Sequence, residues 1–414
     1  MVSVNLGILN GAATCTPKML ETPWEVDTKP GYGPGSSMGD IIPVGSPRQG
    51  GLPEIYRKLS QEELDAKIWA AKKTLGDKLV ILGHFYQRDE VIQYADYVGD
   101  SFQLAKAAQL NPEVESIIFC GVHFMAETAD VLSQANQKVI LPNLAAGCSM
   151  ADMADEDSVE EAWEQLETVL GKLDGEVIPV TYMNSSAALK AFCGRHGGVV
   201  CTSSNAVAVL KWAFTQGKRV LFFPDQHLGR NTAKKLGIPL EEILLWNSRK
   251  PSGGLTAEAI ENSKVLLWNG FCSVHKRFTV DQIAKARVDY ADKNLRVIVH
   301  PECSMEVVDA ADENGSTDYI TKAIAAATEP TVFAIGTEIN LVNRLANEYP
   351  QHEIFCLDPV ICPCSTMYRI HPGYIAWVLD ELVAGRTVNQ IEVPELHKKE
   401  ALVALNRMLS LPPE

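Results

Sequence analysis

The sequence predicts an α/β protein made of three similar three-layer αβα domains with parallel sheets in a pseudo-threefold arrangement. Two observations predict this fold class. From about residue 79 onward, short β-branched runs alternate with helical stretches, which is the pattern of parallel α/β units. The runs also fall into three sets of four that correspond position by position. We expect the domains at residues 61–165, 166–285 and 286–370, between an N-terminal extension (1–60) and C-terminal helices (371–414).

The first 60 residues differ in composition from the rest of the chain. The stretch TPWEVDTKPGYGPGSSMGDIIPVGSPRQGGLP is rich in Gly, Pro and Ser and has no apolar period, so we expect it to be extended or partly disordered. The next segment, SQEELDAKIWAAKKTL (60–75), has the pattern of a helix. Ser60 can cap this helix, acidic residues occupy its first turn and lysines its last.

The strand runs carry polar residues at matching positions. Each first run ends in polar or ring-bearing residues, each second run carries a hydroxyl, and each fourth run ends in Cys-Ser. The runs of the three sets span 78–87, 95–102, 116–127 and 138–150; 176–186, 199–206, 219–229 and 264–275; and 296–305, 313–319, 331–340 and 353–367. The matching residues are His84 and Tyr86, Tyr182 and Asn184, and His300 and Glu302; then Ser101, Ser203, and Ser316 with Thr317; then Cys148, Cys272 and Cys364.

These polar residues are expected to face one cavity. In parallel α/β sheets, ligands bind outside the carboxyl ends of the strands. Three domains packed with those ends facing one another would direct Cys148, Cys272 and Cys364 at a common centre. The same pattern selects Cys364 within the Cys-Pro-Cys segment, because Cys364 has the serine neighbour that the other two cysteines share and Cys362 does not.

Three converging thiolates without a histidine suit a soft metal site. A structural zinc site would need a fourth Cys or His, and such ligands usually come as local pairs. Three cysteines from three domains fit a [4Fe-4S] cluster better, with one iron open to substrate or water. Such an iron is a Lewis acid that promotes loss of water, and Glu302 and His300 could act beside it as acid, base or further ligands. The predicted fold class is then three αβα domains around a central iron-sulfur cluster.

Other cysteines and histidines fit structural positions. Cys303 follows a first strand, so we expect it beside the site rather than among the ligands, and His275 could support the ligands from behind. The cysteines expected in the core are Cys120, Cys201 and Cys356. The histidines expected at the surface are His352, His371 and His397.

Bulk properties exclude several classes of protein. A formal net charge of −15, with no block of Lys or Arg, argues against nucleic-acid or anionic-membrane partners. No apolar run approaches the roughly 18–20 residues needed to span a bilayer, and the start of the sequence lacks a secretory signal pattern. Ten scattered cysteines indicate a reducing compartment, so we expect a cytoplasmic location.

Taken together, the motifs HFYQ, GDS, GVHFMAETA, GCSM, TSSNA, PDQHLG, GFCSVH, HPE and GST resemble those of the quinolinate synthase family. The resemblance covers residues from about 79 to 370. It implies three related α/β domains around a [4Fe-4S] cluster held by Cys148, Cys272 and Cys364. It also implies a transferase, a condensing dehydratase that joins iminoaspartate (iminosuccinate) to dihydroxyacetone phosphate. The products are quinolinate for NAD biosynthesis, phosphate and water.

The same resemblance implies roles for individual residues. His84 and Tyr86 are placed to handle the triose and its proton transfers, Glu302 to reach the open iron or move protons, and His300 to orient a carboxylate. The residues implied in substrate binding are Ser101, Tyr182, Met183, Asn184, Ser203, Pro301, Ser316 and Thr317. An aspartate-oxidising enzyme that supplies the unstable imine is the expected functional partner.

The sequence departs from the family at two places. Some members carry further cysteines near the last ligand at C-x-x-C spacing, whereas this chain has Cys-Pro-Cys, and its extension over residues 1–60 is unusual. Two alternative functions would also use such a cluster: a cluster-based iron or redox sensor, and a hydro-lyase similar to aconitase only in cluster chemistry. A sensor needs no ring of Tyr, Asn, His, Glu and Ser, and the hydro-lyase has no motif of its own here.

Overall fold

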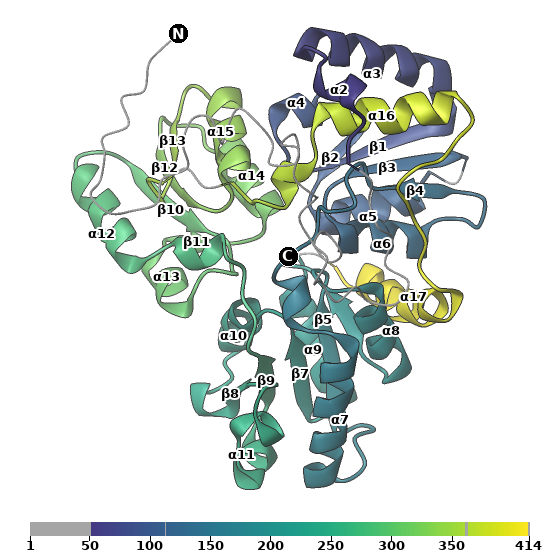
Figure 1. Cartoon of the computed structure of the whole chain (residues 1–414). Coiled ribbons are helices and arrows are strands. Elements are labelled where there is room, and N and C mark those ends of the chain that lie inside the picture. The colour runs from purple at the N-terminus through teal and green to yellow at the C-terminus, as the bar shows by residue number, and fades with distance from the viewer. Residues whose placement is uncertain (1–50, 112, 361–362, 413–414) are drawn as a thin grey trace.

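The computed structural model describes residues 51–111, 113–360 and 363–412. Within this part of the chain the strands form three sheets (Figure 1). Neighbouring strands run parallel, apart from one antiparallel pair in the first sheet, and helices flank the sheets. The predicted α/β class with parallel sheets is therefore confirmed.

All three sheets share one central strand order, in which the first strand lies between the second and the third. In spatial order the strands are β2 (Tyr97–Gly99), β1 (Leu79–His84), β3 (Ser116–Cys120) and β4 (Lys138–Ile140); β6 (Val199–Cys201), β5 (Val177–Tyr182), β7 (Arg219–Phe223) and β9 (Val265–Trp268); and β11 (Glu313–Asn314), β10 (Leu295–Val299), β12 (Val332–Gly336) and β13 (Glu353–Cys356). Beyond the predicted runs, β8 (Ile243–Trp246) extends the second sheet and β14 (Gln390–Ile391) extends the first.

The central strands read as continuous apolar runs because helices cover both faces of each sheet. All residues of β1 and β5 are buried. The helices with the first sheet are α2 (Glu54–Arg57), α3 (Gln61–Leu75), α4 (Asp89–Ile92), α5 (Ser101–Gln109), α6 (His123–Leu132) and α16 (Pro372–Val383). Those with the second are α7 (Glu156–Leu170), α8 (Ala187–Arg195), α9 (Ala206–Gln216), α10 (Gln226–Lys235), α11 (Ala257–Asn262) and α17 (Glu395–Ser410). Those with the third are α12 (Val280–Asp289), α13 (Met305–Ala310), α14 (Thr317–Ala325) and α15 (Ile339–Glu348).

The helix predicted at residues 60–75 is confirmed as α3, with Ser60 as its N-cap. The Ser60 hydroxyl accepts a hydrogen bond from the Glu63 backbone N–H, and the Glu63 carboxylate accepts one from the Ser60 backbone N–H. This capping box satisfies two donors that the first helical turn would otherwise leave unpaired. Most of the predicted extension, residues 1–50, lies outside the described residues.

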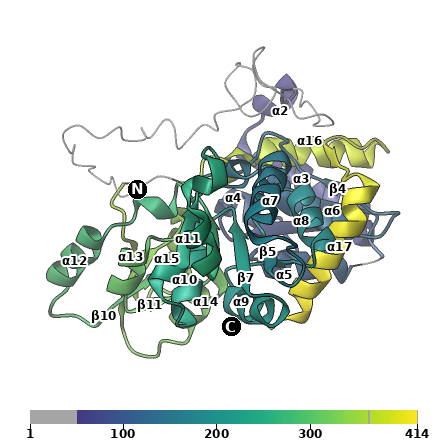
Figure 2. The same cartoon turned by 90° about the horizontal axis from the view of Figure 1, so that it is seen from below.

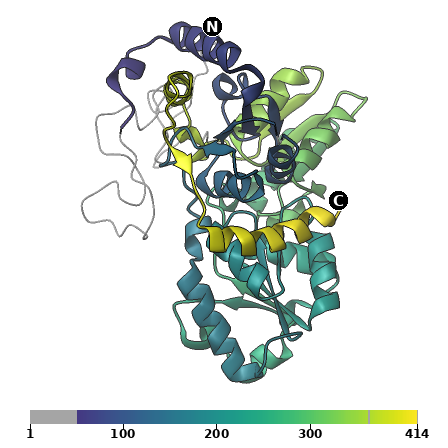
Figure 3. The same cartoon turned by 90° about the vertical axis from the view of Figure 1, so that its right-hand side faces the viewer.

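The first and second sheets share one continuous apolar core, whereas the third sheet has two smaller apolar clusters, one on each face. The C-terminal segment joins the first two sheets. Strand β14 pairs antiparallel with β4, and α17 packs against α6, α8 and β6 (Figures 2 and 3). None of the described helices is long and apolar enough to cross a membrane.

Candidate active site

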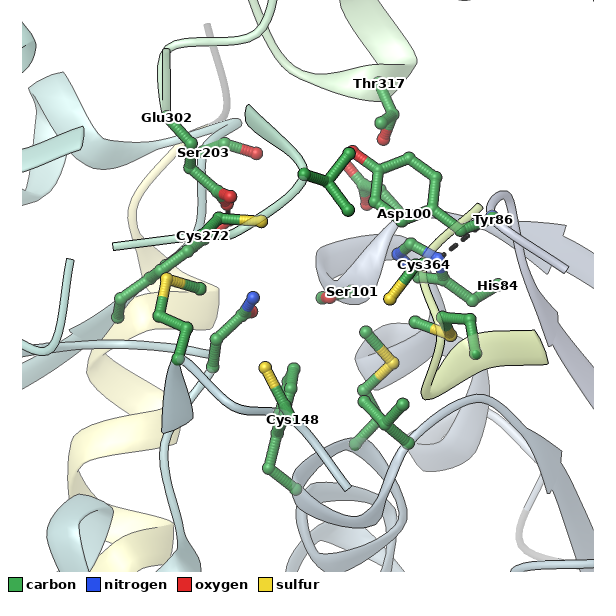
Figure 4. A pocket seen from close by; sticks show the side chains of 18 of the residues that line it. His84, Tyr86, Asp100, Ser101, Cys148, Ser203, Cys272, Glu302, Thr317 and Cys364 are labelled. Atoms are coloured by element: carbon green, nitrogen blue, oxygen red, sulfur yellow. Dashed lines mark hydrogen bonds between the residues drawn. The ribbon is translucent and has the colours of Figure 1, made fainter. Parts of the chain in front are cut away.

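One cavity lies where the carboxyl ends of strands from all three sheets meet (Figure 4). Its empty volume is about 660 Å³, including its opening to solvent. It brings together most of the site residues predicted from the sequence. Those that line it are His84, Tyr86, Ser101, Cys148, Tyr182, Asn184, Ser203, Cys272, His300, Glu302, Thr317 and Cys364.

Three predicted substrate-binding residues do not line the cavity. Met183 is fully buried, and its sulfur accepts a hydrogen bond from the Thr128 hydroxyl at 3.5 Å. Pro301 occupies the corresponding middle position of the turn that carries His300 and Glu302, where the first and third residues line the cavity. Ser316 caps α14, its hydroxyl accepting from the Tyr319 N–H at 3.2 Å. The roles of all three toward a substrate stay predictions.

Cys148, Cys272 and Cys364 occupy matching local structures. In each case the cysteine carbonyl accepts a hydrogen bond from the backbone N–H four residues later, at 3.1, 3.0 and 2.9 Å respectively. A short 3₁₀ helix begins three residues after each cysteine. The repeated turn projects all three sulfur atoms into the cavity (Figure 4). The other half of the Cys-Pro-Cys pair, Cys362, lies outside the described residues.

Burial controls the ionisation of these thiols. It raises the pKa of Cys148 to about 12, and it raises the pKa of Cys364 and, with the nearby Glu302 carboxylate, that of Cys272. A buried thiol becomes a thiolate readily only when a bound cation compensates its charge. Cys364 raises the pKa of Cys148, and both of them raise the pKa of Cys272, so the three thiols lie close enough to form a donor set suited to a soft metal group.

Glu302 is the centre of a buried hydrogen-bond network. Its side chain accepts from the Tyr182 hydroxyl at 2.5 Å and pairs with His275 Nδ1 at 2.8 Å. His275 Nε2 lies 3.1 Å from the Thr337 hydroxyl, which lies 2.9 Å from the Tyr86 hydroxyl. Two tyrosine hydroxyls from different sheets are thus connected through a carboxylate, an imidazole and a threonine.

The electrostatics keep Glu302 ionised although only 3% of its surface is exposed. Burial would raise the pKa of this carboxyl, but His275, His300 and the hydrogen bond from Tyr182 hold the pKa below its ordinary range. Burial and the same carboxylate raise the pKa of Tyr182, which therefore stays protonated. The Cys272 sulfur, a His275 nitrogen and a Glu302 oxygen lie within 4.8 Å of one another, so these three could also hold a metal ion.

His84 and His300 are neutral imidazoles in matching positions. Burial lowers the pKa of each to about 3. Each accepts a hydrogen bond at Nδ1 from the backbone N–H two residues later, at 3.1 Å from Tyr86 and 3.3 Å from Glu302. Because Nδ1 accepts, the proton of the neutral ring is on Nε2, so each ring can present an N–H donor.

Sequence reasoning missed some residues of the site. Asp100 lines the cavity and caps α5, whereas the Gly-Asp-Ser motif that contains it predicts only Ser101 as a site residue. Thr337 follows the third strand of the third sheet, and nothing in the sequence beyond its hydroxyl group marks it as a site residue. His275 takes a central place in the network, more than the supporting position expected from its spacing to Cys272.

The expectations for the remaining cysteines and histidines were mixed. Cys120, Cys201 and Cys303 are fully buried and do not line the cavity. Cys356 is half-buried at the end of β13. His352 was expected at the surface, and this was wrong: it is buried with its ring edge-on to Phe333 at 5.3 Å, where it accepts a hydrogen bond from the Thr331 N–H.

An α/β fold with thiols, neutral imidazoles and a buried carboxylate converging at the strand ends defines a candidate metal-dependent enzyme. Comparison with known families is more specific. The family described as Quinolinate synthetase A protein matches residues 66–410, and the chain belongs to this family.

Curated relatives agree with this assignment. The chain is 69% identical over 382 residues to the quinolinate synthase of Corynebacterium glutamicum, covering 92% of this chain and 96% of the relative. It is 54% identical to that of Streptomyces coelicolor (85% and 89% covered) and 51% identical to that of Bacillus subtilis (87% and 96% covered).

Proposed function

We propose that this protein is a quinolinate synthase, which condenses iminoaspartate with dihydroxyacetone phosphate to quinolinate in NAD biosynthesis, releasing phosphate and water. The observation that carries the proposal is the convergence of Cys148, Cys272 and Cys364 on the cavity that also holds Glu302 and Tyr86, in a chain of this family. We further propose a cytoplasmic location and a functional coupling to an aspartate-oxidising enzyme.

The proposed cofactor is a [4Fe-4S] cluster held by the three cavity cysteines. The three cysteines occupy matching turns, and burial keeps their thiols protonated unless a cation compensates the thiolate charge. Both features fit a group that supplies positive charge to three sulfurs at once. When bound, the cluster would supply an open iron that acts as a Lewis acid in the loss of a hydroxyl. In this proposal each sheet forms one domain of a pseudo-threefold arrangement around the cluster. The bounds are those expected from the sequence, 61–165, 166–285 and 286–370, except that α7, which crosses the first boundary, packs with the second sheet.

Substrate binding is proposed for the hydroxyl and amide groups around the cavity. Ser101, Ser203 and Thr317 come from the first, second and third sheet respectively and lie two or three residues after the second strand of each sheet. With Asn184 and the Nε2–H groups of His84 and His300, they offer donors to substrates that carry carboxylate and phosphate oxygens.

Proton transfer is proposed for the network around Glu302. The ionised carboxylate can take a proton from a substrate carbon, and His275 Nδ1 lies 2.8 Å from the carboxylate to stabilise the change in charge. Tyr86, whose pKa is raised by burial, is protonated and can donate a proton to a departing oxygen. The apolar walls formed by Phe124 and Met125 help to exclude water from these groups.

Anaerobic purification followed by a product assay tests the proposal. The protein, with iron and sulfide measured in the same sample, should form quinolinate from freshly generated iminoaspartate and dihydroxyacetone phosphate. A fully loaded protein that forms no quinolinate would contradict the proposed function and favour a sensor role for the cluster.

A further inference from the structure

The turn that follows the first strand of each sheet carries the residues proposed to act on substrate. These turns comprise residues 84–87, 182–185 and 300–303. The third residue of each turn lines the cavity: Tyr86, Asn184 or Glu302. A turn of this kind leaves backbone carbonyls outside the sheet ladder, and buried carbonyls need hydrogen-bond donors. The source of those donors determines how firmly each turn is held.

Asn231 supplies both donors for the turn that carries Glu302. Its amide nitrogen lies 2.9 Å from the Pro301 carbonyl oxygen and 2.9 Å from the Cys303 carbonyl oxygen, one on each side of Glu302. Asn231 is only 8% exposed. It is the sixth residue of α10, which belongs to the second sheet, whereas the turn belongs to the third.

Arg344 does the same for the turn that carries Tyr86. Its guanidinium donates to the carbonyl oxygens of Phe85, at 3.0 Å, and Gln87, again one on each side of the cavity residue. It is the sixth residue of α15, on the third sheet, and the turn belongs to the first. Asn340, one turn earlier on the same helix, donates to the intervening Tyr86 carbonyl at 3.3 Å.

The third turn is held differently. The sixth residue of α6, Thr128, reaches the turn of the second sheet, but its hydroxyl lies 3.5 Å from the Met183 sulfur and donates to the Phe124 carbonyl of its own helix at 2.8 Å, not to a carbonyl of the turn. The Ser185 carbonyl accepts from the ammonium of Lys190, which belongs to the same sheet as the turn. This difference matches the packing of the apolar cores, because the first and second sheets share one core and the third has separate clusters.

We propose that Asn231 and Arg344 are positioning residues that fix Glu302 and Tyr86 from a neighbouring sheet. Each acts at the equivalent pair of carbonyls, and together they tie the third sheet to both others at the cavity. The proposal rests on the proposed function only in taking Glu302 and Tyr86 to act on substrate. A displacement of reacting groups by about 1 Å can cost about 100-fold in rate, so the contacts matter for turnover as well as for stability.

Double-mutant cycles test this proposal. Asn231→Ala should lower kcat by about 10- to 100-fold in protein with unchanged iron content. If Asn231 acts through Glu302, the variant that also carries Glu302→Gln should be no more than about threefold slower than Glu302→Gln alone, because residues that act as a unit are not additive. Arg344→Met and Tyr86→Phe should form the second non-additive pair. The crossed pairs, Asn231→Ala with Tyr86→Phe and Arg344→Met with Glu302→Gln, should multiply.

A local measurement makes the test independent of activity. Amide hydrogen exchange should accelerate over residues 300–303 in Asn231→Ala and over 84–87 in Arg344→Met, and not in the reverse combination. Thr128→Val is the matched control, since it removes a hydroxyl that donates to no turn carbonyl, and its kcat should stay within about twofold of wild type. If Asn231→Ala does not fold, Asn231→Ser, which keeps one donor, takes its place.

The outcomes separate the proposal from simpler explanations. Multiplicative effects in the matched pairs, or unchanged exchange in the turns, would overturn the positioning role. A wild-type protein that forms no quinolinate while the exchange pattern holds would overturn the proposed function and leave the backbone contacts standing.

Discussion

Replacing Glu302 with Gln should disable turnover while leaving the cavity intact. Glu302 is 3% exposed, and its carboxylate makes two short hydrogen bonds, with the Tyr182 hydroxyl at 2.5 Å and with His275 Nδ1 at 2.8 Å. Gln keeps the size and one acceptor for Tyr182, but it presents an NH₂ group to His275 Nδ1, so the imidazole must adopt its other tautomer. Each hydrogen bond to a charged group contributes about 1.5–3 kcal/mol, and both lose that charge.

The expected effect on rate is larger than a change in substrate binding. Loss of a general acid or base lowers turnover by about 10²-fold or more, which corresponds to about 2.7 kcal/mol in the activation free energy. Iron content and the visible spectrum should match wild type, because the three cysteines are unchanged. Iminoaspartate should still bind through Asn184 and Tyr182.

Single-turnover quinolinate formation under argon, with iron measured in the same sample, is the appropriate assay. It removes product release from the comparison and reports the chemical steps. Near-normal turnover by a fully loaded Glu302→Gln protein would refute the reasoning and reduce Glu302 to a structural residue.

Two further predictions concern pH and oxygen. Burial lowers the pKa of Lys190 to about 8, below its unfolded value, so this side chain binds fewer protons in the folded than in the unfolded state between about pH 8 and 10.5. The contribution of Lys190 to stability should therefore rise with pH in that window, by on the order of 3 kcal/mol. The denaturant midpoint of wild type, measured relative to that of Lys190→Met, which also lacks the charge facing Glu127, should rise across this window; parallel curves for the two proteins would disprove the assignment. Activity should decay in air and return with iron, sulfide and reductant, since an iron without a protein ligand is open to oxidation; full activity in an aerobic, iron-free sample would exclude a catalytic cluster.

Much of the fold was predictable because its signals are local. The apolar strand runs, the capping box at Ser60 and the repeated Cys-Ser ends each follow from a few adjacent residues. The parallel strand order then brings equivalent residues to one end of each sheet. This is why residues as far apart as His84, Ser203 and Cys364 line one cavity.

The features that could not be predicted from the sequence depend on contacts between residues that are distant in the chain. Thr337 matters only because it meets Tyr86 and His275 across two sheets. The addition of β14 to the first sheet and the return of α17 onto the second give no pattern beyond an ordinary strand or helix. In the first-strand turns, first and third residues face the cavity and middle ones do not, so Met183 and Pro301 point elsewhere.

The most direct test of the central claim compares the cysteine variants prepared under argon. Wild type should contain about four irons and four sulfides per chain, as a [4Fe-4S] cluster requires. Cys148→Ser, Cys272→Ser and Cys364→Ser should each lose the cluster, whereas Cys303→Ser, Cys120→Ser and Cys362→Ser should keep most of it. A cluster retained in Cys364→Ser but lost in Cys362→Ser, or one metal ion per chain without sulfide, as the Cys272–His275–Glu302 group could hold, would contradict the account.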